Sequence, residues 1–108
     1  TRYSTGSQNR KVPRARSYRM AELSEKAERY GRMLSDAVES VKVVEDTDEA
    51  DEFHELARSY LEDGRHFLDE DDEVNALAAF SYGHAWLDAG VRVGFFKMEE
   101  GKEDLFAV

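Results

Sequence analysis

The feature that most constrains this chain is a long stretch near its C-terminus that is almost free of charge. Between Val74 and Phe96 the only charged side chains are Asp88 and Arg92, although Asp, Glu, Lys and Arg make up 36% of the sequence. A helix over this stretch must be covered on most of its sides, either by other helices or by lipid.

A polar stripe on the same stretch argues against lipid. Its members are Ser81, His84, Asp88 and Arg92, which follow one another at steps of three and four residues and so share one helical face. An Asp and an Arg at membrane depth would each cost about 2.5–3.5 kcal/mol on insertion scales. We therefore predict a helix over residues 72–98 that is the central member of a bundle and is open along this stripe.

Two earlier helices are predicted to cover it. Over residues 18–44, apolar side chains recur at alternating steps of four and three, the pattern of a helix that packs along one seam. The seam consists of Leu23, Ala27, Tyr30, Leu34, Ala37, Val41 and Val44. A second helix is predicted over 47–69, because Thr47 can cap it and acids follow in its first turn. The acidic run at 69–73 is then a turn plus the cap of the third helix.

Glycines predict where these helices come close together. In the third helix a face of small residues runs through Ala76, Ala79, Gly83, Gly90 and Gly94, which favours close approach by the other two helices. Gly64 in the second helix marks either a weak point or another close approach. The aromatic residues of the third helix are predicted to lie in the core rather than on a recognition surface: Phe80, Tyr82, Trp86, Phe95 and Phe96.

The two ends of the chain differ from its body. Residues 1–17 contain the only proline and almost nothing apolar, so we predict a disordered arm there. The candidate phosphate-contacting residues of this basic stretch are Arg10, Lys11, Arg14, Arg16 and Arg19. The net charge of −9 opposes binding to nucleic acid. The tail, 101–108, ends in the apolar residues 105–108, which either fold back on the bundle or dock on another chain.

The third helix resembles a known family. The segment NALAAFSYGHAWLDAG, Asn75 to Gly90, and its continuation to Gly94 are similar to an archaeal family called domain of unknown function 357. The resemblance implies a small three-helix bundle in an archaeal cytoplasm. It implies no activity, ligand or catalytic residue.

The sequence predicts no catalytic residue, cofactor or metal ligand. It has no cysteine, no phosphate-binding loop and no nucleophile elbow. The pairs His84–Asp88 and Glu62–His66 are four residues apart, whereas metal-binding bundles use a Glu-x-x-His spacing of three. We expect His66 to be exposed. The stripe Ser81, His84, Asp88 and Arg92 is either a hydrogen-bonded edge between helices or a surface that contacts a ligand or partner.

Together these patterns predict an all-α protein, an antiparallel three-helix bundle with a disordered basic N-terminal arm. Its predicted role is a non-enzymatic protein-interaction or scaffolding module in the cytoplasm, with a protein partner or a homodimer and no membrane. Two alternatives stay open: a small-molecule or metal-binding protein that uses the stripe, and a nucleic-acid-associated protein that uses the arm.

Overall fold

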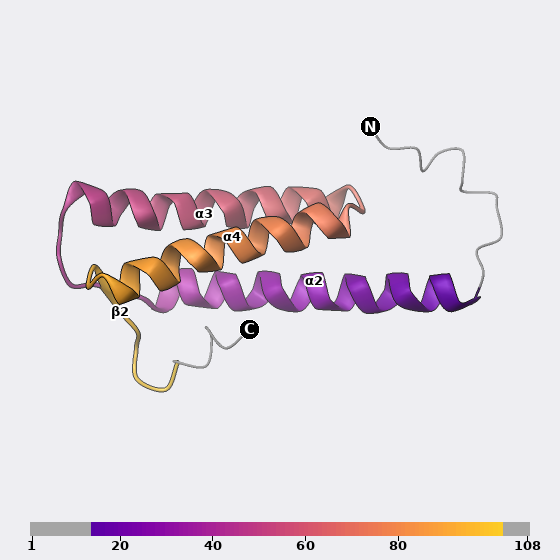
Figure 1. Cartoon of the computed structure of the whole chain (residues 1–108), viewed down its shortest axis with the longest axis horizontal. Coiled ribbons are helices and arrows are strands. Elements are labelled where there is room, and N and C mark those ends of the chain that lie inside the picture. Colours follow the sequence, from indigo (N-terminus) through magenta and orange to yellow (C-terminus); the bar gives the residue numbers. More distant parts are fainter. Residues whose placement is uncertain (1–13, 103–108) are drawn as a thin grey trace.

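The computed structural model describes residues 14–102, with side chains from residue 19 onward. Three helices make up almost all of it: α2 Arg14–Ser40, α3 Asp48–Asp69 and α4 Glu73–Arg92. Two short strands, β1 Lys42–Val43 and β2 Phe96–Lys97, pair antiparallel at one end (Figure 1). The predicted three-helix bundle is confirmed. Most of the predicted arm, and the apolar end of the tail, lie outside the described residues.

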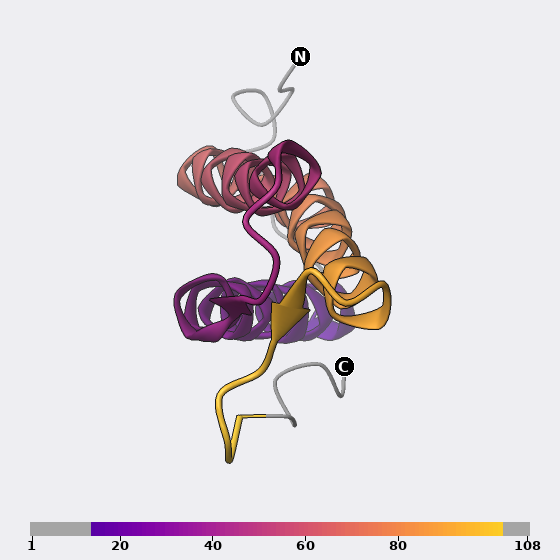
Figure 2. The same ribbon diagram turned by 90° about the vertical axis from the view of Figure 1, so that its left-hand side faces the viewer.

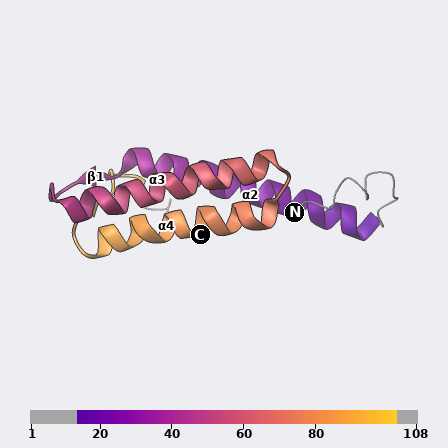
Figure 3. The same ribbon diagram turned by 90° about the horizontal axis from the view of Figure 1, so that it is seen from above.

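The helices run alternately up and down, and α4 lies against both of the others (Figure 2). The helix α2 begins at Arg14, four residues before the predicted start, and its first turns extend past the turn between α3 and α4 (Figure 3). The hydroxyl of Ser24 donates a hydrogen bond of 3.0 Å to the carboxylate of Glu73 at the start of α4. The ten residues before Ser24 therefore project about 15 Å beyond the bundle.

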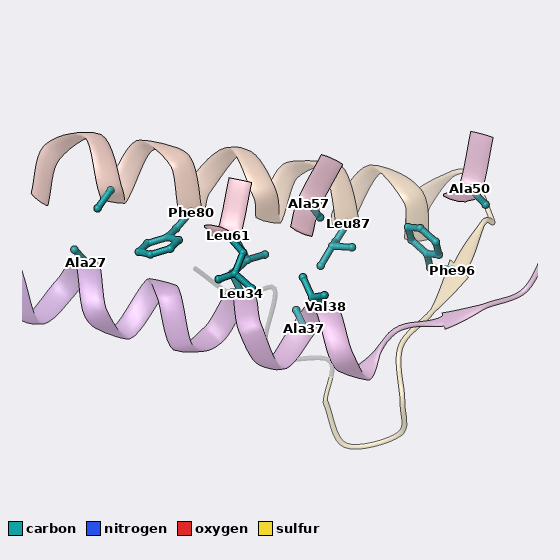
Figure 4. Packing of buried hydrophobic residues seen from close by; sticks show 11 residues of the cluster. Ala27, Leu34, Ala37, Val38, Ala50, Ala57, Leu61, Phe80, Leu87 and Phe96 are labelled. Carbon is teal, nitrogen blue, oxygen red and sulfur yellow. The ribbon is translucent and has the colours of Figure 1, made fainter. Parts of the chain in front are cut away.

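The core lies where the predicted seam of α2 meets α4. Leu34 of α2, Leu61 of α3 and Phe80 of α4 point toward one another, and Leu87 continues the contact along α4 (Figure 4). Burial of each large apolar side chain contributes about 1.5–3 kcal/mol relative to its exposure. The fully buried seam residues are Ala27, Leu34 and Ala37. The seam of α2 thus packs against the other helices of the same chain.

Glycines allow the helices to approach one another, as predicted. A Cβ atom at Gly83 would lie 2.5 Å from Cδ2 of Leu34 in α2 and 3.3 Å from the carbonyl oxygen of Ala57 in α3. A Cβ at Gly64 would overlap the ring of Phe80. Gly64 is therefore a close approach rather than a weak point.

The turn between α3 and α4 is built from the acidic run. Asp71 adopts a left-handed conformation, with φ of 59°. The amides of Asp71 and Asp72 donate to the carbonyls of Leu68 and Phe67, at 3.0 and 2.8 Å, which closes a Schellman motif. Asp72 then caps α4 by accepting from the backbone amide of Asn75. The prediction of a turn plus a cap is confirmed.

Two helices end earlier than their patterns predict, at Ser40 rather than 44 and at Arg92 rather than 98. The residues after Ser40 are rich in β-branched valine and form β1, which pairs with β2. Gly94 stops α4, because its φ of 92° is left-handed and suits glycine. The amides of Gly94 and Phe95 donate to the carbonyls of Val91 and Gly90, which completes a second Schellman motif.

Candidate functional site

The predicted stripe lies along the edge of α4 and is divided between two environments. Ser81 is exposed, and its hydroxyl donates to the carbonyl of Leu77 at 2.9 Å within the same helix. Arg92 donates to the carboxylate of Asp88 at 3.0 Å in an exposed ion pair. His84 turns inward and is 5% exposed. The stripe therefore does not bring four polar groups around one point.

The electrostatics of His84 follow from its burial. Desolvation lowers the pKa of this imidazole from its usual value of 6.5, and the neighbouring Asp88 carboxylate partly opposes that shift. The neutral imidazole is therefore the form that the fold favours. This is the behaviour of an interior histidine rather than of a cationic contact for a ligand.

A groove of about 330 Å³ lies between α2 and α3. Its floor includes Gly31, Leu68 and Phe80, and its walls carry two arginines and two acids. One of the arginines, Arg65, donates to the hydroxyl of Ser35 at 3.1 Å across the groove. None of the four stripe residues lines this groove. The formal charges of the two arginines and two acids in its walls cancel.

Of the basic residues predicted to contact phosphate, the structure describes the side chain of Arg19 alone. Arg10 and Lys11 lie outside the described residues. Arg14 and Arg16 belong to the first turns of α2, where the structure describes the backbone alone, and Arg19 is exposed. Arg14, Arg16 and Arg19 lie at the end of α2 that projects past the bundle.

The aromatic residues of the third helix divide between core and surface. Phe80 and Phe96 are buried, and Trp86 and Phe95 are half-buried. Tyr82, predicted to lie in the core, is 60% exposed, so that prediction is wrong for this residue. The reason is its position on α4, because the buried residues of this helix, among them Phe80, Gly83 and Leu87, lie on a different face from Tyr82. Its ring packs instead on Tyr60 of α3, with 5.5 Å between ring centroids.

Tyr82 is one member of a larger uncharged surface on α4. Val74, Tyr82 and Val93 are 66%, 60% and 60% exposed, and they account for half of the exposed large hydrophobic residues in the described part of the chain. Between them lie three alanines at helical spacing, of which two are exposed and one is half-buried. We call this surface the outward face of α4: Val74, Ala78, Tyr82, Ala85, Ala89 and Val93.

The family model for "Protein of unknown function (DUF357)" matches residues 29–96, which span the core of all three helices. This chain belongs to the DUF357 family. The crystal structure of a DUF357 protein from Archaeoglobus fulgidus superposes with a TM-score of 0.64 at 22% identity. The match covers 74% of this chain and 97% of that one, so the two share a fold. No curated protein matches the sequence.

Two features are absent from the described part of this DUF357 chain. Over residues 14–102, no three side chains of the metal-ligating types His, Asp and Glu come together. In the same range no helix is both long enough and apolar enough to cross a membrane. His66 is exposed, as predicted, and lies 3.3 Å from the carboxylate of Glu70 rather than beside Glu62.

The sequence reasoning missed one histidine of this DUF357 chain. His54 of α3 hydrogen bonds through Nε2 to the carbonyl of Val38 at 3.0 Å, near the end of α2. A carbonyl oxygen can only accept, so Nε2 is the donor in this bond, and Arg58 lies 3.5 Å from the other ring nitrogen. His54 therefore satisfies a terminal carbonyl of α2 and joins two helices. A contact between a side chain and the end of another helix leaves no repeating pattern in the sequence, so this role of His54 could not be predicted.

Proposed function

We propose that this protein is a non-enzymatic, cytoplasmic interaction module whose binding surface is the outward face of α4. The observation that carries the proposal is the exposure of Val74 and Tyr82 on α4 and of Val93 at its C-cap. In a chain with 36% charged residues, a solvent-facing helical surface would ordinarily be charged. Contiguous exposed apolar surface bordered by polar residues is typical of sites for protein partners.

The chemistry of the face supports a protein partner over other ligands. Tyrosine is enriched where proteins bind one another, because its ring gives a large contact area and its hydroxyl tolerates water. Contact with Tyr60 restrains the ring of Tyr82 before any partner arrives, which lowers the entropic cost of binding. The alanines between the larger residues allow the backbone of a partner helix to approach closely.

Two substitutions of the same kind test the proposal. Ala85→Arg places a charge in the middle of the outward face, whereas Ala21→Arg places the same charge at an exposed position of α2. Both sites are exposed and helical, and arginine is a good helix former, so both variants should fold. Circular dichroism checks this.

The test is affinity capture from an extract of the organism that encodes the chain, with quantitative comparison of the bound proteins. We expect Ala85→Arg to lose, by at least about tenfold, the partner that the unchanged chain and Ala21→Arg retain, because a buried unpaired charge costs several kcal/mol. Equal capture by all three forms would refute the proposal.

A further inference from the structure

The outward face of α4 has an internal symmetry that points to its partner. Its members follow at steps of 4, 4, 3, 4 and 4 residues, a sequence of steps that is the same in both directions. About the midpoint between Gly83 and His84, Val74 corresponds to Val93, Ala78 to Ala89 and Tyr82 to Ala85. A helix that meets an antiparallel copy of itself brings these corresponding residues together.

We propose that the partner of this face is a second copy of the chain, bound through an antiparallel contact between α4 and α4 across a two-fold axis. The inference rests on the proposed function and names its partner. A two-fold contact requires one surface that is complementary to itself. The outward face meets that requirement position by position.

The pairing is complementary in size. At the centre, the ring of Tyr82 from each copy comes opposite Ala85 of the other, where the small side chain leaves room for it. At the two ends, Val74 comes opposite Val93, and both are at least 60% exposed in the single chain. A large side chain against a small one lets facing helices interlock without overpacking.

The pairing is also complementary in charge. The face itself carries no charge, so the two copies bring no like charges together along it. Arg92 at the end of α4 comes opposite Asn75 of the second copy, within one turn of Asp72 and Glu73. The cation at one end of the helix thus lies near Asp72 at the start of the other, whereas the carboxylate of Glu73 is hydrogen bonded to Ser24 of α2.

The proposed register can be tested with single cysteines, because the chain has none of its own. In this register Ala78 of one copy lies at the level of Ala89 of the other. Two copies of Ala78 are offset along the helix axis by about 16 Å, too far for a disulfide. A mixture of full-length Ala78→Cys and Ala89→Cys under mild oxidation should therefore give the mixed disulfide in several-fold excess over both symmetric ones.

Sedimentation equilibrium of the full chain gives the second readout. We expect the unchanged chain and Ala21→Arg to dimerise with rising concentration and Ala85→Arg to remain monomeric, its dissociation constant raised at least about tenfold. A statistical mixture of disulfides, or predominant linkage of Ala78→Cys to itself, would overturn the inference.

The two proposals can fail separately. If the chain is monomeric at all concentrations while Ala85→Arg still loses a captured protein, the second copy is wrong and the interaction surface stands. If Ala85→Arg changes neither dimerisation nor capture, both proposals are wrong.

Discussion

Replacement of Gly64 by alanine tests the closest contact in the core. The ring of Phe80 is fully buried between α2 and α3, and both helices carry a glycine where they meet it. A Cβ at Gly64 would overlap the ring. On the other side, a Cβ at Gly31 would lie only 2.8 Å from it, so the ring has little room to move toward α2.

The magnitude follows from two opposing effects. A change from glycine to alanine in an exposed helix stabilises it by about 1 kcal/mol. Overpacking of a filled core costs about 1–3 kcal/mol. We therefore expect Gly64→Ala to lower the free energy of unfolding by up to about 2 kcal/mol, measured by urea denaturation with far-UV circular dichroism. Ser59→Ala, at an exposed site of the same helix, is the control and should change it by less than about 0.5 kcal/mol.

The same substitution in a variant that lacks the Phe80 ring separates the two effects. Phe80→Leu removes the ring, so Gly64→Ala added to that variant should stabilise it by about 1 kcal/mol, the value of an unobstructed helix. If Gly64→Ala stabilises the unchanged chain by that amount, the ring does not separate α2 from α3 and the packing described above is wrong.

Three further changes test individual parts of the fold. Burial lowers the pKa of His84 in the folded chain, so the unfolded chain binds more protons as the pH falls through the usual value of 6.5, and stability falls with it; His84→Gln should weaken that fall in urea denaturation, and an equal fall in both proteins would contradict the reasoning. Thr47→Ala removes the side-chain cap of α3 and should cost about 1 kcal/mol by the same assay, and an unchanged midpoint would show that the cap is unimportant. Asp71 has a left-handed backbone conformation, which glycine adopts without strain, so Asp71→Gly should raise the free energy of unfolding by up to about 1 kcal/mol and with it the melting temperature. A lower melting temperature would show that the backbone of Asp71 is not strained.

The sequence predicts this fold well wherever one periodicity decides the outcome. The seam of α2 identified the residues that meet α4, because a helix buried on one side must repeat its apolar residues. Gly64 of α3 and Gly83 of α4 also marked real close approaches between helices, whereas Gly90 meets Phe96 of β2 rather than another helix. The helix ends were harder to predict. Val41 and Val44 continue the apolar seam in the sequence, although α2 has already ended at Ser40. Gly94 was interpreted as a packing residue, whereas its left-handed φ stops α4.

The outward face of α4 was harder to predict, because exposure depends on how the helices are arranged. Tyr82 lies on a nearly uncharged helix, and from one sequence an uncharged position indicates burial. Only the arrangement of the three helices shows that α2 and α3 leave one face of α4 uncovered. The polar stripe was predicted to be open along its length, and this prediction is wrong at His84, which is buried. Neighbouring helices determine that His84 is buried while Ser81 is exposed.

The most direct test of the account is a dilution series of the full-length, ¹⁵N-labelled chain followed by NMR. Amide shifts report which residues change their surroundings as copies associate. We expect concentration-dependent shifts centred on Ala78, Tyr82 and Ala85 of α4, with Ala21 of α2 unmoved. Shifts centred on α2, or spectra that do not change with concentration, would contradict the assignment of the outward face of α4 as the contact between copies.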